Sequence, residues 1–529
     1  MTELSDVGDE TIREAMERRS RETPHDVYCI FEDRPLTFEA FDAAVNRVAN
    51  ALLARGLCKG DRVALMLPSH PDHIIAIFGL AKIGLVRVPV NVSLVGASLA
   101  FAFEQFDPRA LIADIDYAPR LTEVLARRPL DLVVWRGDTE VGPTWHELAG
   151  HPDARPPRVA PRADDILAIT PSSGTTGAPK GVLKSDRTLR AGPIATRALT
   201  ERTEGDVLLL WEALHHGAGV AVLIGAVLER ITLAMVPRFS ASRFWDDARR
   251  YGVTHIHYLG GVLPMLLAQP PRADDRMHDV RIAWGGGCPN ELWERFEQRF
   301  GVEIREGYGL SELITFVLIN VQGPRGSIGK PLPWYDVRLL GAEGGDVEDG
   351  ETGEIAVRAH DERLGFLGYF RNSEASAAAW REIAGQRWYL TGDLGRRDRD
   401  GWYYYAGRSK DCVRRRGINI SAWEVERVIN EHEDVEESAL VGVPGELGDD
   451  ELLIYIRPVS GRTIAPDALI RWCEPRLPRF QVPRYVAVVD DFPRTPTQRI
   501  RKGDLPRDVA GVWDRDVAAD RSTSKASGP

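Results

Sequence analysis

One short stretch of the sequence, Thr170 to Val182, is rich in groups that bind phosphate. It reads Thr-Pro-Ser-Ser-Gly-Thr-Thr-Gly-Ala-Pro-Lys-Gly-Val and follows an apolar run at 166–169 that predicts a strand. Glycines let a backbone close around an anion, hydroxyl and backbone N–H groups donate to it, and a lysine adds a compact positive charge. The candidate ligands are Ser172, Ser173, Gly174, Thr175, Thr176, Gly177 and Lys180.

The order of these residues decides between two interpretations of the stretch. A loop of glycines and hydroxyls alone is as often a polar surface turn as an anion site. The full series, with proline, lysine and glycine at its end, favours a polyphosphate site. It is not a Walker A loop, because no Gly-Lys-Ser or Gly-Lys-Thr follows at the required spacing.

The composition limits what such a site can serve. A chain of 529 residues is too long for one hydrophobic core, so two or more domains are expected. A hydrophobic content of 43% and a charged content of 27% are typical of a soluble globular protein. The net charge of −11 argues against nucleic acid as the main partner.

Several features of the sequence predict a cytoplasmic protein. No run of about 20 apolar residues exists, so no membrane span is expected. The start, Met-Thr-Glu-Leu-Ser-Asp, is acidic and lacks the apolar core of a secretory signal. The 5 cysteines are scattered without CxxC spacing, which favours a reducing compartment over disulfides or zinc.

The spacing of apolar residues predicts alternating strands and helices. The expected elements are a helix at 36–56, a strand at 63–67, a helix at 71–84 and a strand at 86–90. Strand, helix and strand at this spacing indicate a βαβ unit of a parallel sheet. A similar alternation recurs at 217–236 and 243–259.

The sequence predicts an α/β protein with two domains. A turn-rich run at 341–353, with β-type segments on either side, predicts a small β part of the large domain. From Asp398 onward the pattern is that of a small α+β domain. We therefore expect a large domain of parallel sheets flanked by helices at 1–397, a small domain at 398–507 and a polar, disordered tail at 508–529.

Two adjacent histidines, His215 and His216, precede a glycine-containing run at 217–219. The run is not a dinucleotide loop, because Val222 stands where the third glycine should be. Adjacent histidines point in different directions, so they are also a poor metal pair. A histidine satisfied at the start of a helix is the alternative to a functional one.

His255 and His257 are expected on one face of a strand. Two ligands without a third are weak evidence for zinc, so we favour a packing role. Tyr258 and the glycines at 260–261 follow, and loops after strands carry ligand sites in such sheets. Three further glycines, at 285–287, permit close approach of a flat ligand or a tight turn equally well.

Taken in order, the motifs resemble the adenylate-forming superfamily of acyl-CoA synthetases, peptide-synthetase adenylation domains and luciferases. The stretch at 170–182 is similar to its phosphate loop, Tyr-Gly-Leu-Ser-Glu at 308–312 to its Tyr-Gly-x-Thr-Glu, and 391–393 to its Thr-Gly-Asp. The resemblance covers about residues 15–505, and 420–426 looks like the acyl-CoA synthetase branch, nearest the carnitine-type CoA ligases. Members activate a carboxylate with ATP as an acyl adenylate and pass the acyl group on, usually to a thiol.

The resemblance implies roles for the polar groups of a nucleotide site. Tyr308 would stack on adenine, and Ser311, which replaces the family threonine, would bond the α-phosphate. Asp393 would accept both ribose hydroxyls, and Arg408 would meet the phosphate or the ribose. The site would also include Gly286, Gly287 and Gly309.

The resemblance also implies a metal site and an acyl pocket. Thr176 and Glu312 would hold Mg²⁺, a hard ion that prefers oxygen. His216 with Gly219 matches the family's His-x-x-Gly, whose ring lies beside the acyl carboxylate. The acyl pocket would be lined by Trp211, His216, Tyr258, Gly260, Trp284 and Gly285.

The small domain would carry the hinge and the CoA site. Asp398 matches the position about which a mobile small domain rotates between half-reactions, and Gly417 would line the pantetheine tunnel. Arg414, Arg415 and Arg416 could hold CoA phosphates, since guanidinium groups bind phosphate in a bidentate manner. A solvated basic patch is the alternative for the three arginines.

The sequence departs from the family near its end. The family pattern is Pro-x-Thr-x-x-Gly-Lys-Ile, and its lysine bridges the carboxylate and the α-phosphate during adenylation. This chain reads Pro-Arg-Thr-Pro-Thr-Gln-Arg-Ile at 493–500, so Arg499 takes the lysine position and Lys502 is the nearest lysine. Arginine keeps the charge but has a bulky planar head, so the exchange is not conservative at a tight site.

We therefore predict an AMP-forming acid–thiol ligase that makes a CoA thioester from a carboxylic acid through an acyl adenylate. Its ligands would be ATP or acyl-AMP, Mg²⁺ and CoA, and its catalytic residues His216, Glu312, Arg499 and Lys502. Thioester formation is the favoured half-reaction; adenylation would be slow, would use Lys502, or would be supplied by a separate enzyme. Two alternatives are an adenylating enzyme that loads a carrier protein or an amine, and a catalytically silent acyl-adenylate-binding protein.

Overall fold

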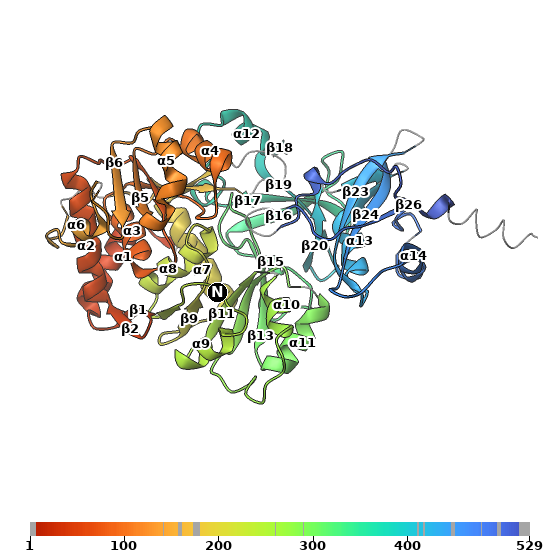
Figure 1. Cartoon of the computed structure of the whole chain (residues 1–529), viewed down its shortest axis with the longest axis horizontal. Helices are drawn as coiled ribbons and strands as arrows, with labels where there is room; N and C mark the ends of the chain where they lie inside the picture. Colours follow the sequence, from red (N-terminus) through yellow and green to blue (C-terminus); the bar gives the residue numbers. More distant parts are fainter. Residues whose placement is uncertain are drawn as a thin grey trace, which may run out of the picture. The chain divides into compact units, whose positions relative to one another are not determined.

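The computed structural model of the chain divides into two compact units (Figure 1). Unit 1 comprises the residues up to Ser172, Pro179–Val337 and Val357–Tyr389. Unit 2 comprises chiefly Arg338–Ala356 and the chain from Leu390 onward. The structure describes residues 7–140, 142–156, 161–172, 180–259, 261–288, 290–409, 412–415, 418–445, 450–477, 479–494 and 499–517.

Within the described residues of unit 1, the larger sheet has nine strands in the order β15-β14-β13-β12-β11-β9-β10-β1-β2. The strands from β13 to β1 are parallel, and antiparallel strands close both edges. Their bounds are β1 Val27–Phe31, β2 Arg34–Thr37, β9 Val207–Leu210, β10 Thr232–Met235, β11 His255–Leu259, β12 Ile282–Gly286, β13 Glu303–Tyr308, β14 Leu318–Asn320 and β15 Lys330–Pro331. Helices α8 (Gly217–Leu228) and α9 (Phe244–Arg250) confirm the alternation predicted at 217–259.

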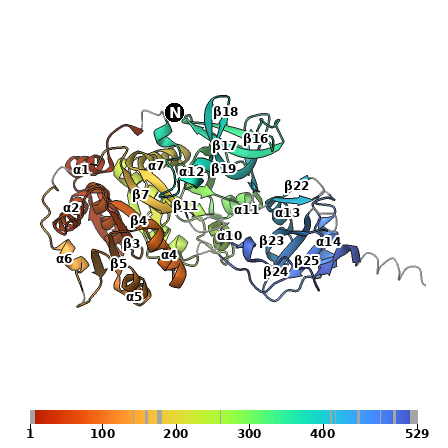
Figure 2. The same ribbon diagram turned by 90° about the horizontal axis from the view of Figure 1, so that it is seen from above.

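The second sheet of unit 1, with six strands in the described part of the chain, has the order β6-β5-β3-β4-β7-β8. Its strands are β3 Arg62–Met66, β4 Val86–Pro89, β5 Ala110–Asp114, β6 Leu132–Arg136, β7 Ile166–Pro171 and β8 Gly181–Ser185. Helix α3 (Pro71–Lys82) joins the parallel pair β3 and β4, so the predicted βαβ unit is confirmed. Figure 2 shows α4 (Gly96–Phe106) and α5 (Ala118–Arg127) beside this sheet.

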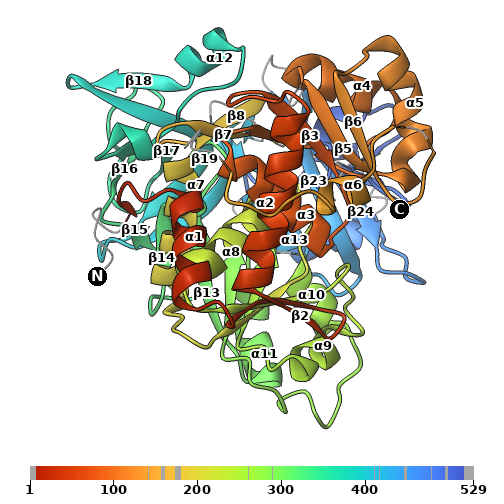
Figure 3. The ribbon, with the colours of Figure 1, turned by 90° about the vertical axis from the view of Figure 1, so that its left-hand side faces the viewer.

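The N-terminal helices begin where the sequence supplies a cap. Helix α1 (Ile12–Glu22) starts with a capping box of Thr11 and Glu14. Helix α2 (Phe38–Ala54), predicted at 36–56, starts after Thr37, whose hydroxyl accepts from the N–H of Ala40. Helix α1 contacts both α2 and α8 (Figure 3), and the remaining helices of unit 1 are α6 Trp145–Ala149, α7 Asp186–Thr200, α10 Val262–Leu267, α11 Asn290–Phe300 and α12 Ser373–Ala378.

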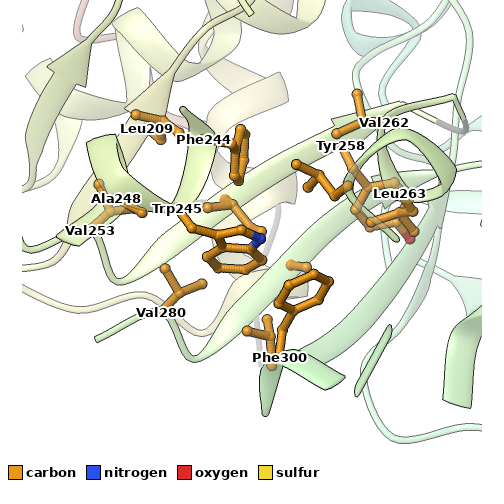
Figure 4. Close-up of a cluster of buried hydrophobic side chains, with 14 of the residues drawn as sticks. Leu209, Phe244, Trp245, Ala248, Val253, Tyr258, Val262, Leu263, Val280 and Phe300 are labelled. Carbon is orange, nitrogen blue, oxygen red and sulfur yellow. The ribbon is translucent and has the colours of Figure 1, made fainter. Parts of the chain in front are cut away.

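A hydrophobic core lies between the larger sheet and helices α9, α10 and α11 (Figure 4). Trp245 stacks on Phe300 within it, with ring centroids 4.5 Å apart. Burying such side chains stabilises the fold by about 1.5–3 kcal/mol each. Tyr258 belongs to the same core, so its hydroxyl must find a partner inside the protein.

The register of β11, β12 and β13 supplies that partner by placing Tyr258, Gly285 and Glu306 in one row. The Tyr258 hydroxyl donates to Glu306 Oε2 at 2.5 Å, across the strand that holds Gly285. A Cβ atom at Gly285 would lie 1.9 Å from the Tyr258 carbonyl oxygen and 3.0 Å from the Tyr258 ring. Close packing between strands therefore requires glycine at 285.

Strand β19 (Gln386–Arg397) takes part in both units. Its first residues pair with β18 (Trp380–Ile383) in unit 1, and its last residues pair with β20 (Tyr403–Arg408) in unit 2. The β-type segments predicted around 341–353 are β16 (Tyr335–Leu340) and β17 (Thr352–Ala359). The expected domain boundary at 397/398 falls in the turn between β19 and β20, whereas the contacts divide the chain at Leu390.

Unit 2 holds a sheet that has, in its described part, four strands in the order β23-β24-β25-β26. From residue 412 onward, the helices and strands of unit 2 are β21 Cys412–Arg415, β22 Ile418–Ser421, α13 Ala422–Ile429, β23 Val435–Pro444, β24 Asp450–Pro458, α14 Pro466–Cys473, β25 Tyr485–Val488 and β26 Trp513–Asp514. The helix predicted to start within 420–426 is α13. The predicted fold class, an α/β protein with a large N-terminal and a smaller C-terminal domain, is confirmed.

The prediction of a disordered tail from residue 508 is wrong for 508–517. Strand β26 pairs with β25, Trp513 packs against the core of unit 2, and the Asp514 carboxylate pairs with Arg484 at 3.1 Å. The polar composition of this segment led to the prediction of disorder, although Trp513 and Asp514 attach it to unit 2. Residues 518–529 lie outside the described part of the chain. Among the described residues, no helix is both long and apolar enough to cross a membrane.

We expect Gly285→Ala to destabilise unit 1. The added Cβ overlaps a backbone oxygen, which no side-chain rotation can relieve, so the loss should be about 1–3 kcal/mol or more. Thermal unfolding measures it as a lower midpoint. The matched control is Gly345→Ala, whose Cβ meets nothing within 4 Å; equal midpoints for the two variants would contradict the packing described for Gly285.

Candidate active site

Polar and glycine residues gather where the parallel strands of the larger sheet end. Trp211 and Glu212 follow β9, the glycines at 285–287 end β12, and Tyr308 ends β13. Because the strands are parallel, these residues share one edge of the sheet. Ligands of open α/β sheets bind outside the carboxyl ends of strands, so this edge is the candidate site of unit 1.

His216 lies at the N-terminal boundary of α8. Its ring centroid is 4.2 Å from that of His215. Burial lowers the pKa of His215 to about 3, and electrostatic interactions with His216, His73 and Arg87 act in the same direction. His215 is therefore neutral, and His216 remains the candidate for contact with a carboxylate at this helix N-terminus.

Glu306 holds the glycine turn at the end of β12. Its carboxylate accepts from the N–H of Cys288 at 3.2 Å, from the N–H of Gly287 and from the Tyr258 hydroxyl. Burial raises the pKa of Glu306 to about 7, against the lowering effect of these donors. Gly287 has φ of 85°, in the left-handed region that favours glycine, and a Cβ at Gly286 would lie 3.0 Å from a backbone oxygen.

The segment after β13 carries the predicted adenine, phosphate and metal residues. Tyr308 is buried, Ser311 is exposed and Glu312 is half-buried. A Cβ at Gly309 would lie 2.1 Å from the carbonyl oxygen of Thr315, so the chain turns back on itself tightly here. This turn places Glu312 near strand β8, the strand that follows the candidate phosphate loop in the sequence.

Tyr369 contacts both Glu312 and Lys180. Its hydroxyl donates to Glu312 Oε1 at 3.1 Å, and Lys180 Nζ lies 4.7 Å from its ring centroid. A cation over an aromatic face is attracted by about 0.5–2 kcal/mol. The Tyr389 hydroxyl also bonds to Tyr369, and burial raises the pKa of Tyr369.

The backbone fixes Tyr369 in this place. The N–H of Leu183 donates to the Gly368 carbonyl at 3.0 Å, and the N–H of Phe370 donates to the Gly181 carbonyl at 2.7 Å. The sequence analysis missed Tyr369. A Gly-Tyr pair between two strands was its signal, but the pairing with β8 spans too many residues to be read from the sequence.

Lys184 is a second basic group near Glu312. Its ammonium donates to the carbonyl of Leu313. Burial lowers the pKa of Lys184 to about 8, while the Glu312 carboxylate opposes the change. Ser172 and Lys180 close the base of the loop, since the Ser172 N–H donates to the Lys180 carbonyl at 2.7 Å.

Two of the acyl-pocket candidates are fully buried. Tyr258 and Trp284 are 0% and 1% exposed. Trp211 Nε1 donates to the carbonyl of His257 at 2.9 Å, and the His257 ring centroid is 4.5 Å from that of Trp284. His257 thus packs between Trp211 and Trp284. The described residues contain no group of three or more side chains that could hold a metal ion.

In unit 2 the predicted nucleotide residues lie together with Arg499. Arg408 Nε pairs with Asp393 Oδ1 at 3.0 Å. Arg499 is exposed, yet partial removal of its guanidinium from water lowers its pKa. The charge of Arg408 lowers this pKa further, whereas Tyr405 and Asp393 raise it. The lysine-replacing arginine is therefore in the field of the carboxylate predicted to bind ribose.

Lys502 is occupied elsewhere in unit 2. Its ammonium pairs with Glu426 Oε1 of α13 at 2.7 Å, and the Lys502 side chain is 20% exposed. The same Glu426 oxygen accepts from the N–H of Leu440 in β23 at 2.5 Å. Lys502 therefore ties the end of unit 2 to its sheet and helix.

The hinge and CoA candidates have structural partners. Asp398 accepts from the N–H groups of Asp400 and Trp402 at 3.0 and 2.9 Å, so it organises the turn between β19 and β20. Arg415 is buried and pairs with Glu451 at 2.7 Å, which does not favour a role in holding CoA phosphates. The predicted residues Ser173, Gly174, Thr175, Thr176, Gly177, Gly260, Arg416 and Gly417, and the side chain of Arg414, lie outside what the structure describes.

Comparisons with known proteins agree over most of the chain. The family model described as AMP-binding enzyme matches residues 16–370, and the one described as AMP-binding enzyme C-terminal domain matches residues 424–499. A crotonobetaine/carnitine–CoA ligase of Salmonella arizonae is 28% identical over 491 residues, which cover 90% of this chain and 94% of that protein. One from Escherichia coli O157:H7 is 28% identical, with 87% and 91% covered.

Solved structures show the same architecture. The o-succinylbenzoate–CoA synthetase of Bacillus subtilis, in complex with its acyl-adenylate intermediate, has a TM-score of 0.83 at 25% identity and covers 94% of this chain and 98% of its own. An anthranilate–CoA ligase in complex with anthranoyl-AMP has a TM-score of 0.83 at 23% identity, with 95% and 98% covered. With a family model matched over more than half of its length, the chain belongs to the AMP-binding enzyme family.

Proposed function

We propose that this protein forms a CoA thioester from a carboxylic acid through an acyl adenylate, and that thioester formation is faster than adenylation. The coarser part follows from the family: the chain is an adenylate-forming enzyme of the acid–thiol ligase type. The finer part rests on one observation, the placement of Arg499 with Asp393 and Arg408 while Lys502 is paired with Glu426.

The charges around Arg499 suit an acyl adenylate. A carboxylate at Asp393 is a natural acceptor for ribose hydroxyls, and guanidinium groups at Arg408 and Arg499 suit a phosphate. Two positive groups beside one negative group leave the cluster net positive. Such a site matches the single negative charge on the phosphate of an acyl adenylate.

Adenylation requires a more precisely placed positive charge than the binding of an acyl adenylate does. It brings the acyl carboxylate and the α-phosphate together, and a positive group must stabilise the charge that builds up between them. The small ammonium of a lysine can do this in a tight space, whereas the planar guanidinium of Arg499 spreads its charge and needs room. We infer that ATP-dependent activation is slow, or that a separate enzyme supplies the acyl adenylate.

Lys502 is a poor substitute for the missing lysine. Its ammonium already pairs with a carboxylate on α13 and is largely removed from water, so releasing it would break an ion pair whose two side chains are 20% and 13% exposed. Breaking a buried pair in this way is costly. We therefore assign Lys502 to the structure of unit 2 and Arg499 to the adenylate.

Magnesium fits the oxygen-bearing groups near the phosphate loop. Glu312 offers a carboxylate, the ligand type that Mg²⁺ prefers, and bound Mg²⁺ would neutralise phosphate charge on ATP. Tyr369 orients this carboxylate by donating to one of its oxygens, and its ring faces Lys180. We propose that Tyr369 is a positioning residue for both groups.

We expect Arg499→Lys to raise the rate of thioester formation from free acid and ATP by about 10- to 100-fold. One preorganised contact of this kind is typically worth about 10²–10³ in rate, and the variant should recover part of it. The rate from a synthetic acyl adenylate should change little, because the mixed anhydride bond between the acyl group and the phosphate is already made. A coupled thioester assay over a panel of acids, run with ATP and with acyl adenylates, measures both rates.

Lys502→Ala is the control for that experiment. It should lower stability without changing the ratio of the two rates, because its partner is structural. If the native protein runs the full reaction quickly and Lys502→Ala abolishes the ATP-dependent step alone, Lys502 is the working lysine and our assignment is wrong.

We expect Tyr369→Phe to weaken Mg²⁺-dependent binding of a non-hydrolysable ATP analogue by about 3- to 10-fold. The change removes the hydroxyl that orients Glu312 and keeps the ring beside Lys180. Calorimetry with and without Mg²⁺ measures it. Tyr335→Phe is the matched control, since it removes another buried hydroxyl that donates to the carbonyl of Leu364 at 2.9 Å; equal effects of both variants would refute the positioning role.

A further inference from the structure

Three buried polar side chains, from Glu212, His257 and Trp284, meet at the edge of the larger sheet where its strands end. Glu212 follows β9, and His257 and Trp284 are registered neighbours on β11 and β12. Glu212 Oε2 lies 3.3 Å from His257 Nδ1, and both side chains are 6% exposed. The Trp284 ring lies on the same imidazole, with its centroid 4.5 Å away.

Burial decides the charge of this cluster. It raises the pKa of Glu212 to about 8 and lowers the pKa of His257 to about 3. Near neutral pH both groups are therefore uncharged, and the 3.3 Å contact is not an ion pair but a contact of a neutral carboxylic acid with a neutral imidazole. The cluster presents hydrogen-bonding groups without a net charge.

Two polar atoms of the cluster have no hydrogen-bond partner among the described residues. They are Glu212 Oε2 and Trp284 Nε1, on residues that are 5% and 1% exposed. Leaving a buried polar group unsatisfied costs about 1–3 kcal/mol. The second group is a donor only, whereas a protonated carboxyl both donates and accepts, so together they can satisfy one ligand group that does both.

We propose that Glu212 and Trp284 recognise a neutral hydroxyl group on the acyl part of the substrate, so that the preferred acids are hydroxy acids. The ligand oxygen accepts from the indole N–H of Trp284, and its hydrogen is donated to the Glu212 carboxyl, which lies against the imidazole of His257. This inference rests on the proposed function, because it takes the strand-end edge of unit 1 as the acyl site.

Two features separate this cluster from ordinary packing and from a cation site. Trp245 Nε1 is also unpartnered among the described residues, but its ring stacks on Phe300 and His278 in the core between the larger sheet and helices α9, α10 and α11. An ammonium ligand would require Glu212 to ionise in a buried place, and it could accept nothing from the Trp284 N–H. A hydroxyl uses both unpartnered atoms at no cost in charge.

The test measures binding, so that slow adenylation cannot hide the result. Non-hydrolysable acyl-sulfamoyl adenosines are titrated into the full chain by calorimetry, in matched sets on two scaffolds: 4-hydroxybenzoyl, 4-methylbenzoyl and 4-(aminomethyl)benzoyl; and 6-hydroxyhexanoyl, heptanoyl and 6-aminohexanoyl. We expect the hydroxyl member of at least one set to bind about 10- to 100-fold more tightly than its methyl and ammonium partners.

Variants identify the groups responsible. Trp284→Phe and Glu212→Leu should each bring the hydroxyl-to-methyl ratio close to one, chiefly by tightening the methyl analogue. Glu212→Gln, which keeps a donor and an acceptor, should retain most of the ratio. Trp245→Phe is the matched control, because it removes a buried indole N–H outside the cluster and should leave the ratio unchanged.

The outcomes separate this inference from the proposed function. If the methyl or ammonium analogues bind as tightly as the hydroxyl ones on both scaffolds, the proposed function stands and the inference is overturned. The same holds if Trp284→Phe and Glu212→Leu leave the ratio as in the native protein. If no acyl analogue binds more tightly than AMP itself, the proposed function fails, and the inference fails with it.

Discussion

The parallel register of β11, β12 and β13 is the constraint on which the candidate site of unit 1 depends. It aligns the strand ends, so residues far apart in the sequence share one edge of the sheet. It also sets two rows on opposite faces: Tyr258 with Glu306 on one, and His257 with Trp284 on the other. One row holds the glycine turn at 285–287 in shape, and the other forms the buried polar cluster beside it.

Burial gives the two carboxyl groups of these rows their properties. Glu306 and Glu212 both have raised pKa values, about 7 and about 8, because each is removed from water. They differ in their partners: Glu306 accepts from backbone and tyrosine donors, whereas one oxygen of Glu212 accepts from no described residue. The Glu306 carboxyl therefore has a structural role, and the Glu212 carboxyl can still accept a hydrogen bond from a ligand.

Features that depend on neighbouring residues in the sequence could be predicted, whereas contacts between residues far apart in the sequence could not. The fold class, the βαβ unit, the helix at α13 and the family follow from motif order and apolar spacing. Tyr369, Glu212 and the partner of Lys502 could not be predicted, because each acts on a residue more than 40 positions away. The strand at Trp513 was missed because one aromatic residue and one ion pair outweigh a polar composition.

The replacement of lysine by Arg499 need not weaken the binding of an acyl adenylate. Binding needs a positive field at one phosphate, and we propose that Arg408, which pairs with Asp393, and Arg499 supply it together. Bond formation needs a compact charge that can follow two anions as they approach, whereas the planar guanidinium of Arg499 spreads its charge over a larger head. On this proposal the site still distinguishes one acyl adenylate from another, because we assign that choice to the candidate acyl-binding residues of unit 1. We therefore propose that substrate choice and chemical activation are separable in this chain, and that its departure from the family pattern affects activation alone.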